Sequence, residues 1–139
     1  MKGTLFAVQK ALPLMPRGAS IVINASMVSI KGTPALSVYS ASKAPLRSFA
    51  RTWSVDLKDR NIRVNAISPG VIITPGYMSE LGLSDAQIEE MKAQTAASAP
   101  SGRVGTPIEV ARAVAFLASD ESSYINGVEL FVDGRAAQI

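Results

Sequence analysis

Two short runs of apolar, mostly β-branched residues constrain the fold of this chain most strongly. The first is ASIVINAS, residues 19–26, and the second is IRVNAIS, residues 62–68. Each is apolar without regular alternation, which is typical of a strand covered on both faces in a parallel sheet. Parallel strands need a long crossover connection, and the segment between the two runs is long enough to hold a helix. The pair therefore predicts a strand–helix–strand unit of an α/β protein.

The segment between the two runs carries one stripe of residues at helical spacing. At steps of three and four residues, its members are Tyr39, Lys43, Leu46, Ala50, Trp53 and Leu57. This spacing predicts a helix from about residue 37 to residue 58. Pro45 lies inside that helix, where a proline removes an amide donor and costs roughly 3 kcal/mol, so we expect local strain there.

The rest of the chain predicts three more helices and a third strand. Apolar residues at helical spacing predict a helix over 1–15, and residues 69–83 are rich in proline and glycine and predict a loop. Ser84 and Thr106 are each followed three residues later by a glutamine or glutamate, which is the signature of a helix start, and the second of these helices should end near Ser119. GVELFVDG, residues 127–134, predicts the last strand.

Composition limits the chemistry that the chain can perform. Its 139 residues, 47% apolar and 18% charged, predict one globular domain. The absence of cysteine and histidine excludes disulfides, thiol nucleophiles, imidazole triads and the usual metal ligands. The net charge of +3 is spread over interspersed residues of both signs, which argues against a nucleic-acid partner. The sequence shows neither a signal peptide nor an apolar stretch of membrane-span length, so we expect a cytoplasmic protein without a membrane partner.

Three polar side chains are predicted at one edge of the sheet. Parallel α/β sheets bind ligands at the carboxyl ends of their strands; Ser26 ends the first run, and Tyr39 and Lys43 begin the helix after it. An ammonium within about 4–6 Å of a phenol favours its ionised form, so this pair is suited to proton exchange. The same pair is also typical of a half-buried tyrosine packed beside a lysine that reaches for solvent. Ser29 is an alternative to Ser26 as the hydroxyl of such a site.

Four stretches together resemble the carboxyl-terminal half of the short-chain dehydrogenase/reductase family: SIVINAS, YSASK, IRVNAISPG and RVGTPIEVARAVAFLASDESSYINGVELFVDG. The resemblance covers nearly the whole chain. It implies the carboxyl-terminal portion of a Rossmann-like, doubly wound parallel sheet with three strands and about four helices, as a single partial domain over 1–139. The glycine-rich first half, which binds the pyrophosphate, is absent from this sequence. Arg135 stands where the family often has a second glycine, and we expect it to affect packing at the carboxyl terminus.

The resemblance implies an NAD- or NADP-dependent oxidoreductase that interconverts an alcohol and a ketone or aldehyde. Tyr39 would be the general acid/base, Lys43 would assist it and hold the nicotinamide ribose, and Ser26 would polarise the substrate oxygen. The implied nicotinamide contacts, besides Tyr39 and Lys43, are Pro69, Gly70, Ile72 and Thr74.

Further expectations concern the substrate and the assembly. Residues 76–97 correspond to the family's substrate lid. The implied substrate contacts are Tyr77, Met78 and Leu81. Family members are commonly tetramers, and the surfaces they use, helices 1–15 and 37–58 together with the last helix and strand, persist here, so we expect a dimer or a tetramer. The alternative is a truncated, catalytically inactive remnant that retains these oligomerisation surfaces, and the exposed edge of strand 19–26 predicts self-association in either case.

Overall fold

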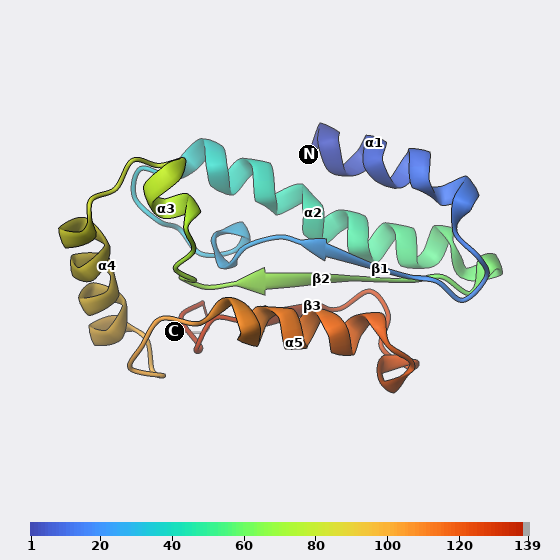
Figure 1. The fold of residues 1–139 in the computed structure, drawn as a ribbon. Coiled ribbons are helices and arrows are strands. Elements are labelled where there is room, and N and C mark those ends of the chain that lie inside the picture. The colour runs from blue at the N-terminus through green and yellow to red at the C-terminus, as the bar shows by residue number, and fades with distance from the viewer. Residues whose placement is uncertain (138–139) are drawn as a thin grey trace.

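A three-stranded parallel sheet forms the centre of the molecule. The computed structural model of the chain describes residues 1–137. The strands are β1 (Ser20–Asn24), β2 (Arg63–Pro69) and β3 (Glu129–Val132), and they lie in the order β1-β2-β3 with both neighbouring pairs parallel. Each strand falls inside the stretch from which it was predicted, apart from one residue at the end of β2. The α/β class and the parallel sheet are therefore confirmed (Figure 1).

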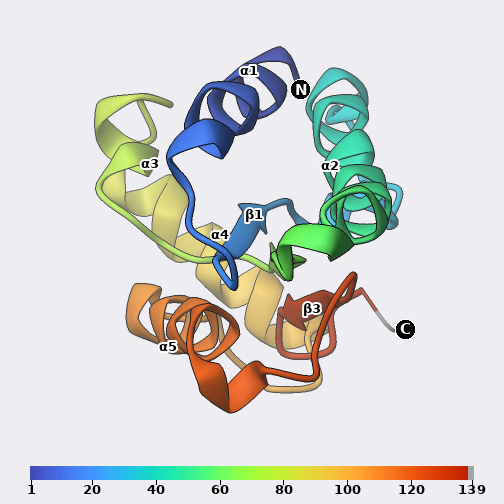
Figure 2. The same cartoon turned by 90° about the vertical axis from the view of Figure 1, so that its right-hand side faces the viewer.

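Helices cover both faces of this sheet. On one face lie α1 (Lys2–Ala11) and α2 (Ser37–Asp56), and on the other lies α5 (Pro107–Ala118), as the end-on view shows (Figure 2). The remaining helices, α3 (Gly76–Ser79) and α4 (Asp85–Ser98), lie beyond the carboxyl ends of the strands (Figure 1). Short 3₁₀ turns occupy Leu12–Leu14, Met27–Ser29, Lys58–Arg60 and Asp120–Ser122.

The stretch expected to be a loop, residues 69–83, is partly ordered into α3, so the described residues hold five α-helices. α3 starts just after Pro75, whose fixed φ suits the beginning of a helix. Further order comes from Ile72, which pairs with Gly105 in an isolated parallel bridge. Both features bring this segment over the carboxyl end of the sheet.

The two sides of the sheet differ in how deeply their strands are buried. In β2 every residue from Val64 to Ser68 is buried, as expected for a strand covered on both faces. In β1 only Ile21 and Ile23 are buried, whereas Asn24 is exposed. Helices lie on both faces of β1, as expected, but its outer edge has no neighbouring strand in the described residues, so β1 is the exposed edge strand that the sequence predicts.

The main core lies between the sheet and the two helices above it. Burying an aliphatic side chain stabilises the fold by about 1.5–3 kcal/mol, so this layer supplies much of the folding free energy. Its fully packed members are Ile21, Ile23, Ala25, Leu46, Ala50, Ile62, Val64 and Ala66. The predicted stripe of α2 supplies Leu46 and Ala50 to this core, and the helix continues through Pro45 without a break.

Two asparagines fix the register between β2 and the segment before β3. The side chain of Asn65 is fully buried; its Nδ2 donates to the carbonyl of Ile125 at 3.0 Å, and its Oδ1 accepts the amide of Val128 at 3.0 Å. The Oδ1 of Asn126 accepts the amide of Val64 at 2.8 Å. A buried polar group left unpaired costs about 1–3 kcal/mol, so a slipped register would be strongly disfavoured.

Both predicted helix starts are observed. The amide of Ser84 donates to Oε1 of Gln87 at 2.9 Å, and the amide of Gln87 donates back to Oγ of Ser84 at 3.3 Å. The amide of Thr106 donates to Oε2 of Glu109 at 2.8 Å. Hydrogen bonds from Arg103 and from Thr106 lower the pKa of Glu109 to about 2.

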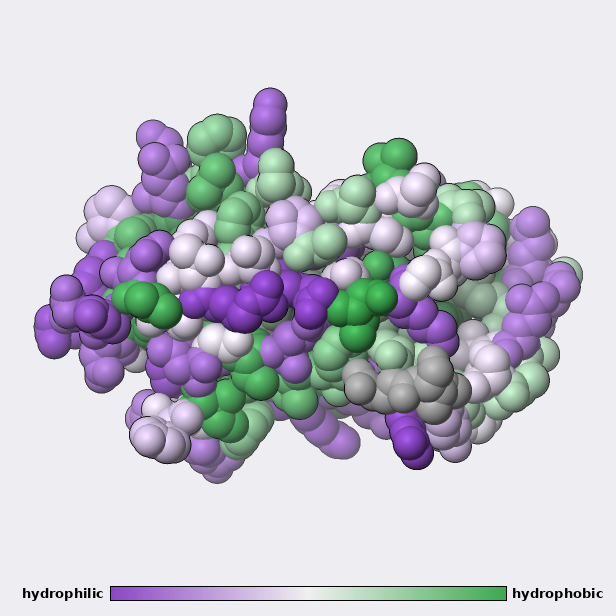
Figure 3. Space-filling model, turned by 180° about the vertical axis from the view of Figure 1, so that it is seen from behind, coloured by the Kyte–Doolittle hydropathy of each residue, from purple (hydrophilic) through white to green (hydrophobic). Residues whose placement is uncertain are grey.

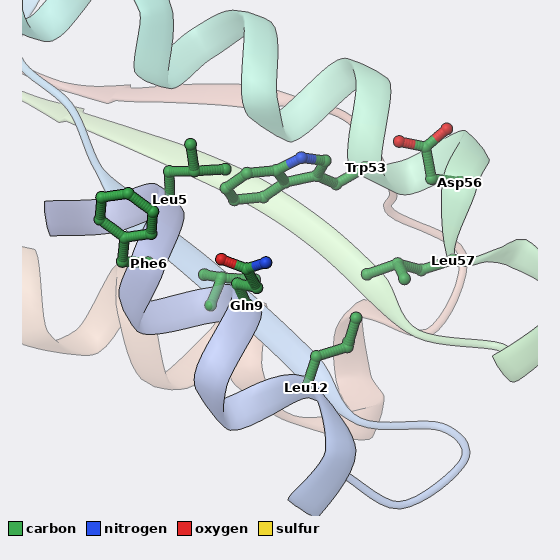
Figure 4. A pocket seen from close by; sticks show the side chains of 8 residues that line it. Leu5, Phe6, Gln9, Leu12, Trp53, Asp56 and Leu57 are labelled. Atoms are coloured by element: carbon green, nitrogen blue, oxygen red, sulfur yellow. The ribbon is translucent and has the colours of Figure 1, made fainter. Parts of the chain in front are cut away.

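An apolar groove of about 470 Å³ lies between α1 and α2 (Figure 4). Apolar side chains of α1, among them Leu5 and Phe6, face Trp53 and Leu57 across it. The Trp53 ring also stacks on Phe49, with ring centroids 4.4 Å apart and planes 7° from parallel. Trp53 thus packs against the core cluster and also lines an open groove.

Hydrophilic and hydrophobic residues are interspersed over the face seen from behind (Figure 3). Within residues 1–137, no helix combines the length and the apolar character needed to span a membrane.

Candidate active site

A cavity of about 390 Å³ lies at the carboxyl ends of β1 and β2, beside the first turns of α2. Ser26, Tyr39 and Lys43, the three residues predicted to be catalytic, all line it. The other predicted residues in its wall are Pro69, Gly70, Ile72, Thr74 and Tyr77. Residues from four separate segments of the sequence therefore meet at the edge of the sheet where ligands of such folds bind.

Ser26 reaches this cavity because β1 ends just before it. Its backbone is extended, with φ −171° and ψ 153°, and its carbonyl accepts the amide of Ser29 at 2.9 Å as the chain turns into the 3₁₀ turn. The alternative residue, Ser29, does not line the cavity, since its hydroxyl donates to Oε1 of Glu129 at 3.1 Å. Of the two serines, only Ser26 is placed to meet a ligand.

Tyr39 and Lys43 lie one helical turn apart at the start of α2, as their spacing predicts. The Nζ atom of Lys43 is 5.6 Å from the centroid of the Tyr39 ring. The same Nζ atom donates to the carbonyl of Asn24 at 3.2 Å, which holds the ammonium against the end of β1. Tyr39 lines the cavity and is 46% exposed, so its side chain is not sealed in the protein interior.

The turn after β2 forms a second wall with little side-chain bulk. The amide of Gly70 donates to the carbonyl of Val132 at 3.0 Å, and a Cβ at Gly70 would stand only 2.8 Å from Cα of Asp133. Only glycine fits this close approach. Further along, a Cβ at Gly105 would overlap the side chain of Ile72, so the missing side chain at Gly105 leaves room for Ile72.

The predicted substrate contacts separate into two groups. Tyr77 on α3 is half-buried in the cavity wall, and burial, together with the neighbouring Tyr39, raises the pKa of Tyr77 above its ordinary value. Its phenol therefore stays protonated and can donate a hydrogen bond. Met78 lines a different groove, between α3 and α4, and Leu81 is 66% exposed. Neither Met78 nor Leu81 lines the cavity.

Four further residues line the cavity without having been predicted. Asn24 and Ala25 adjoin Ser26 at the end of β1, where their position in the strand was a usable signal. Pro107 and Val110 come from the first turn of α5, which the bridge between Ile72 and Gly105 brings alongside. No local sequence pattern indicates that contact, because it depends on how distant segments pack.

The arrangement is suited to chemistry on an oxygen atom of a small molecule. The hydroxyl groups of Ser26, Tyr39 and Tyr77 belong to residues that line one cavity, and none is hydrogen-bonded to another residue within the described part of the chain. The Lys43 ammonium supplies the only formal charge among the lining side chains of the described residues. Hydroxyls and an ammonium can bind an oxygen and exchange a proton with it.

Comparison with known proteins gives consistent matches along nearly the whole chain. The profile of the family described as enoyl-(acyl carrier protein) reductase matches residues 1–134. Oxidoreductase asL5 of Sarocladium schorii is 43% identical over an alignment of 141 positions, which covers 100% of this chain and 54% of that protein. The 3-oxoacyl-[acyl-carrier-protein] reductase FabG of Thermotoga maritima is 44% identical over an alignment of 137 positions, which covers 96% of this chain and 52% of that protein. The chain thus spans about half the length of the curated relatives it matches.

Solved structures agree with these matches. Aldohexose dehydrogenase AldT of Thermoplasma acidophilum superimposes with a TM-score of 0.88 and 34% identity, covering 99% of this chain and 56% of that one. The angucycline C-6 ketoreductase LanV, solved with bound NADP, gives a TM-score of 0.87 and 30% identity, covering 99% of this chain and 51% of that one.

Proposed function

Since the chain belongs to the short-chain dehydrogenase/reductase family, we propose that it forms the catalytic and substrate-side part of an NAD- or NADP-dependent oxidoreductase. The proposed reaction interconverts an alcohol and a ketone or aldehyde. The observation that carries the proposal is the single cavity lined by Ser26, Tyr39 and Lys43. The reductase and dehydrogenase names of the matched proteins support it.

Each of the three residues has one proposed task. The phenol of Tyr39 gives a proton to the carbonyl oxygen during reduction and takes it back during oxidation. The ammonium of Lys43, 5.6 Å from the ring centroid, stabilises the negative charge that the phenol oxygen gains after giving up its proton. The hydroxyl of Ser26 donates a hydrogen bond to the same substrate oxygen and orients it.

The residues present fit the nicotinamide end of NAD or NADP. Pro69 and Gly70 give a wall without bulky side chains, Thr74 offers a hydroxyl, and Tyr39 and Lys43 would hold the ribose. When bound, the nicotinamide ring supplies or accepts the hydride. The sequence carries no glycine-rich turn between a strand and a helix, so the fit concerns the nicotinamide end and not the pyrophosphate.

Isothermal titration calorimetry with NADPH and NADH tests this proposal. We expect the 139-residue chain to bind the nucleotide saturably, with lower affinity when Lys43→Ala removes the ribose contact. A control substitution, Lys92→Ala on α4, lies outside the cavity and should leave the affinity unchanged. Equal affinity in the wild type and in Lys43→Ala would contradict the proposed contact, and so would an equal loss of affinity in Lys92→Ala.

A second candidate role is assembly, and the groove between α1 and α2 favours it. Leu5 is 39% exposed and Phe6 is 54% exposed beside Trp53, which leaves apolar surface for another subunit to cover. We propose a homo-oligomer, a dimer or a tetramer, which would form whether the chain is active or an inactive remnant. Light scattering that shows a monomer at all concentrations would contradict this proposal. A cytoplasmic location stays a prediction from composition.

A further inference from the structure

A cluster of buried and partly buried polar side chains is centred on Glu129 of β3. Its Oε1 atom accepts the hydroxyl of Ser68 at 2.6 Å and the hydroxyl of Ser29 at 3.1 Å. Its Oε2 atom forms an ion pair with Nε of Arg47. The side chains of Glu129 and Arg47 are only 12% and 28% exposed. This carboxylate therefore has three partners from three different segments of the chain.

Each partner adjoins a residue of the site. Ser29 lies in the turn that follows Ser26, and the two are joined by the backbone hydrogen bond of 2.9 Å. Ser68 immediately precedes the Pro69–Gly70 turn. Arg47 follows Lys43 by one turn on α2. Nη1 of Arg47 also donates to the carbonyl of Ser29 at 3.4 Å, so α2 and the serine turn are joined twice.

The chemistry of Glu129 suits the fixing of geometry. A carboxylate accepts several hydrogen bonds at once, and a guanidinium is planar with fixed donor directions, so the two serines and Arg47 must take one arrangement. Buried ion pairs contribute little stability compared with apolar packing, but breaking one leaves an uncompensated charge. A glutamine at this position has one acceptor oxygen in place of two and no charge, so it cannot bind the two serine hydroxyls and Arg47 at once.

We propose that Glu129 is a positioning residue of the site, which acts through Ser29 and Ser68 to fix Ser26 and the Pro69–Gly70 turn relative to Tyr39. Its effect on turnover rests on the proposed function, whereas its effect on local order does not. The sequence offered no sign of this role, because Glu129 stands in a strand far from the predicted catalytic residues. Parallel pairing of β2 with β3 brings it under the site.

Amide hydrogen exchange on Glu129→Gln tests the structural part. We expect exchange at least tenfold faster at the amide of Ser29, which bonds Ser26, and at the amide of Gly70, which bonds Val132. The amide of Ala66 in the centre of β2 should keep its wild-type rate. Glu89→Gln, which removes an ion pair on the surface of α4, is the matched control and should change none of these rates.

An unchanged rate at Ser29 in Glu129→Gln would overturn the proposal, whether or not the chain is active. If this variant does not fold, Ser29→Ala removes the 3.1 Å bond alone and should still speed exchange at residue 29. A wild-type rate there would overturn the proposal equally.

A double-mutant cycle tests the catalytic part. We expect Glu129→Gln to lower kcat about tenfold with little change in KM, and to have no further effect on kcat in a Ser26→Ala background. If the double variant loses kcat by the product of the two single losses, Glu129 does not act through Ser26. A wild-type chain without any turnover would contradict the proposed function instead, and the exchange rates would still decide the role of Glu129.

Discussion

Replacing Gly70 by alanine tests whether the close approach of the β2 and β3 ends builds the site wall. The new Cβ would stand 2.8 Å from Cα and 2.9 Å from Cβ of Asp133, whereas ordinary contacts begin at 3.4 Å. These atoms belong to the backbone and to the first side-chain carbon, so they cannot rotate away. The ends of the two strands must separate, and the 3.0 Å hydrogen bond from Gly70 to Val132 must lengthen.

The expected cost follows from those two changes. Overpacking costs about 1–3 kcal/mol and a lost hydrogen bond about 0.5–1.5 kcal/mol, so Gly70→Ala should lower the free energy of unfolding by about 2–4 kcal/mol. For a chain of this length the entropy of unfolding is about 0.3 kcal/mol per degree, so the Tm should fall by about 7–14 °C.

Differential scanning calorimetry measures this change, and Gly32→Ala provides the control. A Cβ at Gly32 would meet no atom within 4 Å, and its φ is not left-handed, so its Tm should stay close to that of the wild type. Scans with added NADPH measure the rise in Tm that the nucleotide causes, and this rise should be smaller in Gly70→Ala than in the wild type. Equal Tm values for the two variants would refute the steric reasoning.

Three other predictions follow from single residues. Arg103 holds the pKa of Glu109 at about 2, below its ordinary value of 4.5. The ionised Glu109 therefore stabilises the fold above pH 4.5, and this stabilisation is lost as the pH falls toward 2. Glu109→Gln should flatten that part of a Tm-versus-pH curve. Arg135 has a left-handed φ of 73°, so Arg135→Gly should raise the urea midpoint by an amount equivalent to about 1 kcal/mol, and an unchanged midpoint would argue against strain there. Tyr39→Phe should lower the raised pKa of Tyr77 without restoring the ordinary value, because burial is the larger cause; an ultraviolet titration measures this.

Local signals were sufficient to predict most of the fold. The apolar runs at 19–26 and 62–68 contain β1 and nearly all of β2, and the capping pattern at Ser84 marks the start of α4. Errors arose where the outcome depends on neighbours. The helix α3 formed inside a proline- and glycine-rich stretch that has no amphipathic pattern and was expected to be a loop.

The same distinction, between local sequence signals and the packing of neighbours, holds for the candidate site. Ser26 and Tyr39 were found because parallel folds collect residues at the carboxyl ends of strands, a rule that needs only the order of elements. Leu81 was assigned to the substrate side by resemblance and lies at the surface instead. Val110 and Glu129 were not predicted. Val110 lines the cavity and Glu129 binds Ser29 only because segments far apart in the sequence pack together. Sequence patterns thus predicted which residues line the cavity better than they predicted the contacts that support those residues.

The most direct test of the central claim is a single-turnover experiment with NADPH and a small carbonyl compound such as a 3-oxoacyl thioester. With the wild-type chain in excess over NADPH, the carbonyl compound should oxidise NADPH, and one molecule of alcohol should form for each NADPH consumed. Tyr39→Phe should bind NADPH with similar affinity but slow this step by at least about 100-fold, since general acid catalysis typically contributes that much. A Tyr39→Phe variant as fast as the wild type, or a wild-type chain that binds NADPH and forms no alcohol, would contradict the account.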